Sequence, residues 1–300
     1  MQISTNLYYD RSKAQFNVLQ TQVDKLQTQI STGKKVQAPS DDAVSYQRLQ
    51  NLTVGTADDT AWASNINLAR TILSQADTTL GSITDRLQGL QELAVQANNG
   101  TLSGDDRKIL ATQVRAAIDD LVALANTTDV RGQPLFGAAT GSTAVSVDAS
   151  GTVSFTGTGQ PAGIPIGQGT SVQTSETAER IFGNVPISSG TTDVFALLDS
   201  FATALEGGNT VPADVLDGLK AAGNQITSVR GVAGARSARL ELEAGRIQET
   251  QTTRTASRSD IEDVDVPSAI ADLQKLSTVL QATQASFSKF SQLSLFDYLR

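Results

Sequence analysis

The chain contains no cysteine, no histidine and a single methionine among its 300 residues. Without cysteine it cannot form disulfides, and a zinc or haem site would lack the side chains that usually ligate such groups. Nucleophilic catalysis would also lack the histidine that most often serves as its base. We therefore expect no enzyme activity, no cofactor, no metal site and no catalytic residue.

Long apolar runs are also missing. No segment of about 18 apolar residues occurs, so we expect no membrane insertion. The first residues show no basic segment followed by an apolar core, so we expect no cleaved secretory signal. Acidic residues outnumber basic ones by 31 to 23, a net charge of −8. We expect no nucleic-acid partner, because binding duplex nucleic acid requires a basic face.

Charge and aromatic content differ from those of an ordinary globular domain. Residues 1–40 and 264–300 together hold eight Lys or Arg and five Asp or Glu, a net charge of +3, which leaves −11 for the middle of the chain. Aromatic residues make up only 5% of the sequence, which suits long helices with narrow apolar seams. We expect the two ends to crowd together in an assembly and the middle to face water.

Both ends of the chain carry apolar residues at alternating spacings of three and four, the period of a coiled coil. The C-terminal seam contains Val266, Ala269, Leu273, Leu276, Leu280, Phe287 and Phe290, with the polar Thr283 in one of its places. The N-terminal seam contains Phe16, Leu19, Val23, Leu26 and Ile30. The matching periods predict that the two ends form helices that pair with each other.

The same spacing predicts helices along most of the remaining chain. We expect helices over 41–52, 58–98, 103–124, 193–205 and 212–263, with 58–98 and 103–124 forming an antiparallel hairpin. Ser40 is the expected N-cap of the helix over 41–52, with Asp41 and Asp42 in its first turn. A cation site at these two carboxylates is the weaker alternative, because two neighbouring ligands are too few.

Two glycines interrupt the expected helix over 212–263. Gly231 and Gly234 each cost about 1 kcal/mol relative to alanine in a helix interior. Such a cost is tolerated where another backbone comes close, so these glycines, with Arg236 and Arg239, predict a tightly packed stretch of helix. Phosphate binding by the two arginines is the weaker alternative, because acidic residues follow directly.

The middle of the chain has a different composition. Asp148 is the only charged residue from Gly137 to Ser175, where Gly, Ser and Thr dominate. Val145, Val147, Val153 and Phe155 alternate around a turn, as in a half-buried hairpin. Residues 137–190 therefore predict a small β-rich domain, with a flexible linker as the alternative.

Three segments resemble the bacterial flagellin superfamily: Ile30–Ala43 (ISTGKKVQAPSDDA), Arg230–Glu241 (RGVAGARSARLE) and Leu293–Leu299 (LSLFDYL). The resemblance covers both flanks, about two-thirds of the chain. It implies a mainly α fold, a long antiparallel helical bundle or coiled coil built from both chain ends with a small central β-rich domain. The expected domains are 1–40 plus 264–300, an inner coiled coil; 41–136 plus 191–263, a helical bundle; and 137–190, an outward domain.

The resemblance implies a structural flagellar subunit that is exported through a type III channel and assembles outside the cell. The C-terminal Ser-Leu-Phe-Asp-Tyr-Leu pattern and the modest central segment favour the junction between hook and filament over the filament itself. The implied partners are like subunits in a ring, a neighbouring hook-associated protein, flagellin, and a cytoplasmic chaperone that covers the C-terminal helix. An enzyme on the central segment and a secreted coiled-coil effector or pore-former are the weaker alternatives.

The C-terminal seam extends beyond the part that residues 16–30 can cover. We expect its last apolar residues to contact other subunits or the chaperone rather than the chain's own core. These residues are Phe287, Phe290, Leu293, Leu295 and Phe296.

Overall fold

The computed structural model describes the backbone of residues 2–296 and the side chains of residues 7 and 9–289. Two compact units divide the chain: a terminal unit of residues 1–58 and 250–300, and a central unit of residues 59–249. This division differs from the three domains expected from the sequence, because the central segment shares a core with the neighbouring helices.

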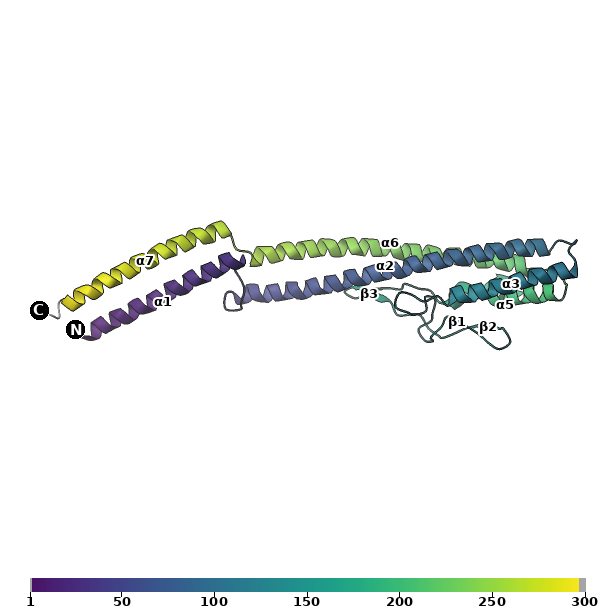
Figure 1. The fold of residues 1–300 in the computed structure, drawn as a ribbon, viewed down its shortest axis with the longest axis horizontal. Helices are drawn as coiled ribbons and strands as arrows, with labels where there is room; N and C mark the ends of the chain where they lie inside the picture. Colours follow the sequence, from purple (N-terminus) through teal and green to yellow (C-terminus); the bar gives the residue numbers. More distant parts are fainter. Residues whose placement is uncertain (1, 297–300) are drawn as a thin grey trace. The chain divides into compact units, whose positions relative to one another are not determined.

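Long helices from both parts of the chain dominate the fold, which confirms the predicted class (Figure 1). Their bounds are α1 Gln2–Thr32, α2 Ala43–Ala97, α3 Gly104–Ala125, α4 Ala178–Phe182, α5 Val194–Glu206, α6 Asp214–Glu262 and α7 Val266–Phe296.

Helix α2 is continuous through residues 53–57, where at most a short break between two helices was expected. The hydroxyls of Thr53 and Thr56 donate to the carbonyls of Leu49 and Leu52, at 2.9 and 2.8 Å, so both threonines are satisfied within the helix. Residues 53–57, between the two expected helices, are therefore helical as well.

The start of α2 also differs from the prediction. Asp42 rather than Ser40 caps it, with one carboxylate oxygen accepting from the backbone amides of Val44 and Ser45 at 3.0 and 3.1 Å. Asp41 instead accepts from the amides of Gln37 and Ala38 in the preceding loop, both at 3.1 Å. The two carboxylates thus act on different sides of the helix start.

Apolar residues of α2 at heptad spacing form one side of the core of the central unit. The residues between Ile66 and Ala97 that follow the heptad period are all buried: Ile66, Ala69, Leu73, Ala76, Leu80, Ile83, Leu87, Leu90, Ala94 and Ala97. Helix α3 begins directly after Ser103, where the expected helix starts, and Ser103 is its N-cap and forms a capping box with Asp106. It adds the buried residues Leu110, Val114, Ala117 and Leu121 to the same core.

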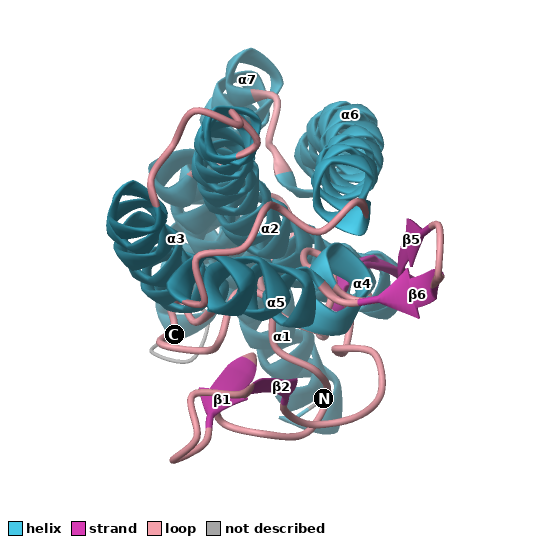
Figure 2. Ribbon diagram, turned by 90° about the vertical axis from the view of Figure 1, so that its right-hand side faces the viewer, coloured by secondary structure: helices cyan, strands magenta, loops and turns pink. Residues whose placement is uncertain are grey.

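Helix α5 packs beside α3 in the central unit (Figure 2). Arg115 of α3 reaches α5, where its Nε donates to Glu206 at 3.0 Å and its guanidinium also pairs with Asp199. These contacts raise the pKa of Arg115 above its usual value, the bonds to Glu206 and then Asp199 being the main causes. Burial of apolar side chains holds helices α3 and α5 together, and the ion pairs of Arg115 lie at the solvent-facing edge of their contact.

The strands of the described residues form three separate antiparallel hairpins, and two of them, β1–β2 and β5–β6, are labelled in Figure 2. Their bounds are β1 Val145–Val147 with β2 Val153–Phe155, β3 Ile164–Gly167 with β4 Thr170–Val172, and β5 Val185–Ile187 with β6 Gly190–Thr192. The first hairpin has the predicted register, pairing Val145 with Phe155 and Val147 with Val153. In β3 both Ile164 and Ile166 are buried beside a register shift after Pro165.

Amide side chains of the helical parts satisfy backbone groups of the irregular segments. The carboxamide oxygen of Asn126, just after α3, accepts from the amides of Ala144 and Val145, both at 3.0 Å. Gln225 of α6 donates to the carbonyls of Arg180 and Gly183 at 2.7 and 2.8 Å. A segment with so little regular structure can stay packed on helices because its backbone groups find partners there.

Candidate assembly site

Helices α1 and α7 lie side by side in the terminal unit (Figure 1). Each is 31 residues long, so the N-terminal helix covers more of its partner than the sequence suggested. The predicted seams face each other. Val23 and Ala269 are buried, whereas Val266 at the start of α7 is exposed, contrary to its expected place in the seam. The other described apolar seam residues are half-buried: Phe16, Leu19, Leu26, Ile30, Leu273, Leu276, Leu280 and Phe287.

A pair of helices can cover only one stripe on each member, so further apolar side chains remain in water. Val18 of α1 is 56% exposed, and Ile270 and Val279 of α7 are 41% and 43% exposed. These exposed aliphatic side chains lie on the same two helices as the half-buried seam. The terminal unit therefore offers apolar surface for further helices.

Phe287 lies within the helix pair, contrary to the expectation that it would extend beyond it. Its ring meets that of Tyr9 edge to face, with 5.4 Å between the ring centroids. Helix α1 begins several residues before the first seam residue and so reaches Phe287. The side chains of Phe290, Leu293, Leu295 and Phe296 lie outside the described residues, and their assigned role stays a prediction.

The loop between α1 and α2 docks on the segment between α6 and α7. Gly33 ends α1 with a φ of 72°, a backbone conformation that glycine adopts readily. Its carbonyl accepts from the amide of Val264 at 2.9 Å, and the amide of Lys35 donates to the carbonyl of Glu262 at 2.7 Å. Two chain reversals that are far apart in sequence are thus joined by backbone hydrogen bonds.

Charged side chains reinforce this joint. The Glu262 carboxylate, in a residue only 9% exposed, pairs with Lys34 and accepts from Arg258 Nε at 2.7 Å. Arg258 and then Lys34 lower the pKa of Glu262. Asp41 pairs with Lys25 at 3.0 Å. The amide of Gln37 and the Lys25 ammonium lower the pKa of Asp41 to about 2, so both carboxylates are ionised near neutral pH.

The prediction of close packing at Gly231 and Gly234 is wrong within this chain. Both glycines are exposed, and a Cβ at either position would meet nothing within 4 Å. Arg236 has a different role, donating to the nearly buried Glu176 at 2.6 Å and so holding the central segment on α6. Arg239 is exposed.

The glycine of α6 that does permit close packing is Gly218, which sequence reasoning missed. A Cβ there would lie 2.6 Å from a methyl of Leu197 in α5 and 3.0 Å from one of Ile187 in β5. Gly218 lies four residues after the start of α6. A glycine this close to a helix start is ordinarily interpreted as part of the turn before the helix, so its packing role was not recognised from the sequence.

Metal and membrane chemistry find no support in the described part of the chain. No group of three or more carboxylates in residues 2–296 is arranged to hold a metal ion. Within the same residues no helix has the length and hydropathy of a membrane span. The candidate site is the surface of the paired terminal helices, where Val18, Ile270 and Val279 are exposed beside the seam.

Comparison with known proteins identifies the family. Residues 3–140 match the bacterial flagellin N-terminal helical region, and residues 216–299 match the bacterial flagellin C-terminal helical region. These two matches cover more than half of the chain. The chain belongs to the bacterial flagellin family.

Within the flagellin family, hook-associated proteins match along the whole chain. It is 31% identical to flagellar hook-associated protein 3 of Escherichia coli, covering 99% of both chains. It is 25% identical to flagellin of Listeria monocytogenes over 97% of this chain and 95% of that one. The structure of flagellar hook-associated protein-3 from Legionella pneumophila has a similar fold, with a TM-score of 0.63 at 16% identity over 73% of this chain and 98% of that one.

Members of the flagellin family are structural proteins of the bacterial flagellum, outside the cell, rather than members of an enzyme class. This chain is accordingly a structural flagellar protein that assembles with other flagellar subunits.

Proposed function

We propose that this chain is the structural subunit that joins the flagellar hook to the filament. The observation that carries the proposal is the pair α1 and α7, whose seam is only half covered although the two helices are equal in length. The full-length similarity to flagellar hook-associated protein 3 supports the junction as its place.

Assembly follows from helix packing. Val18, Ile270 and Val279 lose water when a neighbouring subunit covers them. Because about half of each side chain is already covered, each contributes about 1 kcal/mol to association. The well-packed central unit supplies a body that does not depend on this contact, because its core residues lie within residues 59–249. The subunit would thus form a ring of like copies between a hook-associated protein and flagellin.

Filament flagellin is the second candidate. Its support is the similarity to Listeria monocytogenes flagellin along nearly the whole chain. Against it stand the C-terminal Ser-Leu-Phe-Asp-Tyr-Leu pattern and the higher identity to the hook-associated protein.

Export in an unfolded state through a type III channel is part of the proposal. The absence of cysteine suits such a passage, because no disulfide can form before or during export. A cytoplasmic chaperone would cover the apolar stripe of α7, which includes Leu273, Leu276 and Leu280. Co-purification of this chain with a cytoplasmic protein should therefore require α7. Retention of the same protein after deletion of residues 266–300 would contradict this role.

Electron microscopy of a deletion strain tests the proposed function. If this chain is the junction subunit, its absence leaves complete hooks without filaments, and flagellin is released into the medium. If it is filament flagellin, the hooks carry a complete junction with little or no filament. Complementation with the intact gene should restore filaments in the first case, and wild-type filaments on the deletion strain would contradict both assignments.

A further inference from the structure

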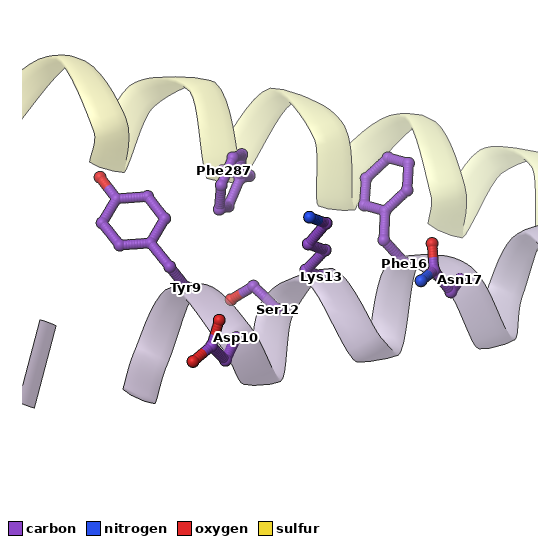
Figure 3. A pocket seen from close by; sticks show the side chains of 7 residues that line it. All are labelled: Tyr9, Asp10, Ser12, Lys13, Phe16, Asn17 and Phe287. Atoms are coloured by element: carbon purple, nitrogen blue, oxygen red, sulfur yellow. The ribbon is translucent and has the colours of Figure 1, made fainter. Parts of the chain in front are cut away.

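A pocket of about 490 Å³ opens along the paired terminal helices (Figure 3). Its volume falls within the range of about 300–1,000 Å³ that is common for ligand sites. Six residues of α1 and one of α7 line it: Tyr9, Asp10, Ser12, Lys13, Phe16, Asn17 and Phe287. The pocket is therefore a defined hollow on the same surface that the proposed function requires.

The walls of the pocket combine aromatic rings with two opposite charges. Lys13 projects between the rings of Phe16 and Phe287 (Figure 3). Asp10 lies three residues earlier on α1, about one helical turn from Lys13. A complementary guest would present an aromatic or aliphatic centre flanked by one acidic and one basic group.

The last four residues of the chain have this composition. They read Asp297-Tyr298-Leu299-Arg300, with the acid and the base separated by the same three positions as Asp10 and Lys13. In opposite chain directions, Asp297 would meet Lys13 and Arg300 would meet Asp10. Tyr298 and Leu299 would then occupy the aromatic part of the pocket.

The chain's own tail is too short to fill its own pocket. Helix α7 continues from Phe287 to Phe296, which carries the chain about 13 Å past the pocket at about 1.5 Å per residue. Tyr298 follows two residues later, and two residues span at most about 7 Å. The backbone of Tyr298 in a returning tail therefore stops short of Phe287, so we look for the guest in another molecule.

We propose that this pocket receives residues 297–300 of a second copy of the chain. The inference rests on the proposed function, since self-assembly supplies the second copy, and it names the contact between neighbouring subunits. Tyr298 and Leu299 provide the buried apolar area, and the charges at the rim fix the direction in which the tail enters. One copy's C-terminal tail thus links it to the α1–α7 pair of the next.

The absence of cysteine allows a direct test by cross-linking. One gene copy carries Lys13→Cys and a second carries Tyr298→Cys, and both are expressed in the deletion strain. Isolated hook–filament complexes are then oxidised with diamide, which accepts the two thiol hydrogens as the disulfide forms. We expect disulfide-linked dimers that contain one copy of each variant, because the two thiols belong to different molecules.

Arg11→Cys is the matched control, because Arg11 is exposed on the same turns of α1 but on the side away from the pocket. Paired with Tyr298→Cys it should give at least tenfold less dimer. Equal dimer from the two pairs, or no dimer from either, would overturn the inference. A single chain carrying both Lys13→Cys and Tyr298→Cys should form linked multimers, and an internally closed monomer would show that the tail binds its own chain.

Association of the purified full chain provides a second measurement that does not depend on incorporation in cells. Sedimentation at increasing concentration should show about tenfold weaker self-association for Tyr298→Ala than for the unmodified chain, and little change for Tyr298→Phe. Unchanged association of Tyr298→Ala would overturn the inference. If the cysteine variants reach the junction and the cells swim without cross-linking, only the pocket contact fails. Complete filaments in the deletion strain would instead remove the proposed function.

Discussion

At the scale of single residues, the charge of the Glu262 side chain stabilises the contact between the α1–α2 loop and the segment between α6 and α7. Lys34 and Arg258 contact its carboxylate, and the backbone carbonyl of the same residue accepts from Lys35. Because its pKa is lowered in the folded state, ionised Glu262 contributes stability above its ordinary pKa of 4.5. That contribution is lost as the pH falls through the lowered value.

Glu262→Gln should therefore flatten the acid dependence of the terminal unit. Near neutral pH the variant should melt at a lower temperature than the unmodified chain, because Gln cannot form the two ion pairs. Between about pH 5 and pH 3 the melting temperature of the unmodified chain should fall more than that of the variant. Calorimetry over this range makes the measurement, and parallel decreases in the two proteins would contradict the role of Glu262.

Two glycines of α6 provide a matched pair of alanine substitutions. Gly218→Ala should destabilise the central unit, because the overfilling next to the buried Leu197 costs about 1–3 kcal/mol. The helix propensity gained by alanine, up to about 1 kcal/mol, offsets only part of this cost. Gly234→Ala should stabilise the helix by up to about 1 kcal/mol, since the added methyl meets open space. Denaturant unfolding of both variants decides between these signs, and equal effects would mean that packing does not distinguish the two positions.

At the scale of elements, Asn126 links α3 to the first hairpin. Its carboxamide satisfies the amides of Ala144 and Val145, both of which are nearly fully buried. Asn126→Ala should cost about 1–3 kcal/mol of unfolding free energy, because buried donors then lack partners. Asn67→Ala, at an exposed position of α2, is the control and should change little. A neutral Asn126→Ala would indicate that water replaces the carboxamide.

The pairing of α1 with α7 can be tested with two identical substitutions on one helix. Val23 is 6% exposed in the seam and Val18 is 56% exposed outside it. Val23→Asp should separate the two helices, because it buries an unpaired carboxylate at a cost of several kcal/mol. Val18→Asp should leave the pairing intact in the isolated chain, because Val18 lies outside the seam. Both variants change helix propensity equally, so propensity cannot cause a difference between them.

Hydrogen exchange of α7 reports on this pairing, and the melting of the central unit serves as the internal standard. Faster exchange of α7 in Val23→Asp alone is expected. Equal exchange in the two variants would contradict the seam. Loss of filaments with Val18→Asp, despite intact pairing, would in addition locate Val18 at a contact between subunits.

At the scale of the whole molecule, the division into two units predicts that folding and assembly can be separated. The core cluster that extends from Ile66 to Ile247 lies within the central unit. A chain of residues 43–262 should therefore keep cooperative thermal unfolding and a high helix content, yet fail to restore filaments in the deletion strain. Circular dichroism and motility measure the two properties. A fragment that is unfolded would show that the terminal helices are needed for the fold.

Periodicity in the sequence was sufficient to predict the long helices and their buried faces. The α2 seam from Ile66 to Ala97, the helix start at Ser103 and the hairpin of Val145 with Phe155 all follow from local spacing and turn chemistry. The flagellin resemblance of the N-terminal and C-terminal segments agrees with the family matches. Such features depend on residues close in sequence, so they can be read without knowing the fold.

Other features depended on contacts between distant residues and were decided only by tertiary structure. Nothing in the local sequence distinguishes Gly218 from Gly231 and Gly234, but of these three glycines only Gly218 packs against another element. Phe287 meets Tyr9 because α1 begins earlier than its seam, and Glu262 joins Lys34 across more than two hundred residues. Local sequence determines which face of a helix is apolar. Which neighbour covers that face depends on where the chain reverses, and this is a property of the folded molecule.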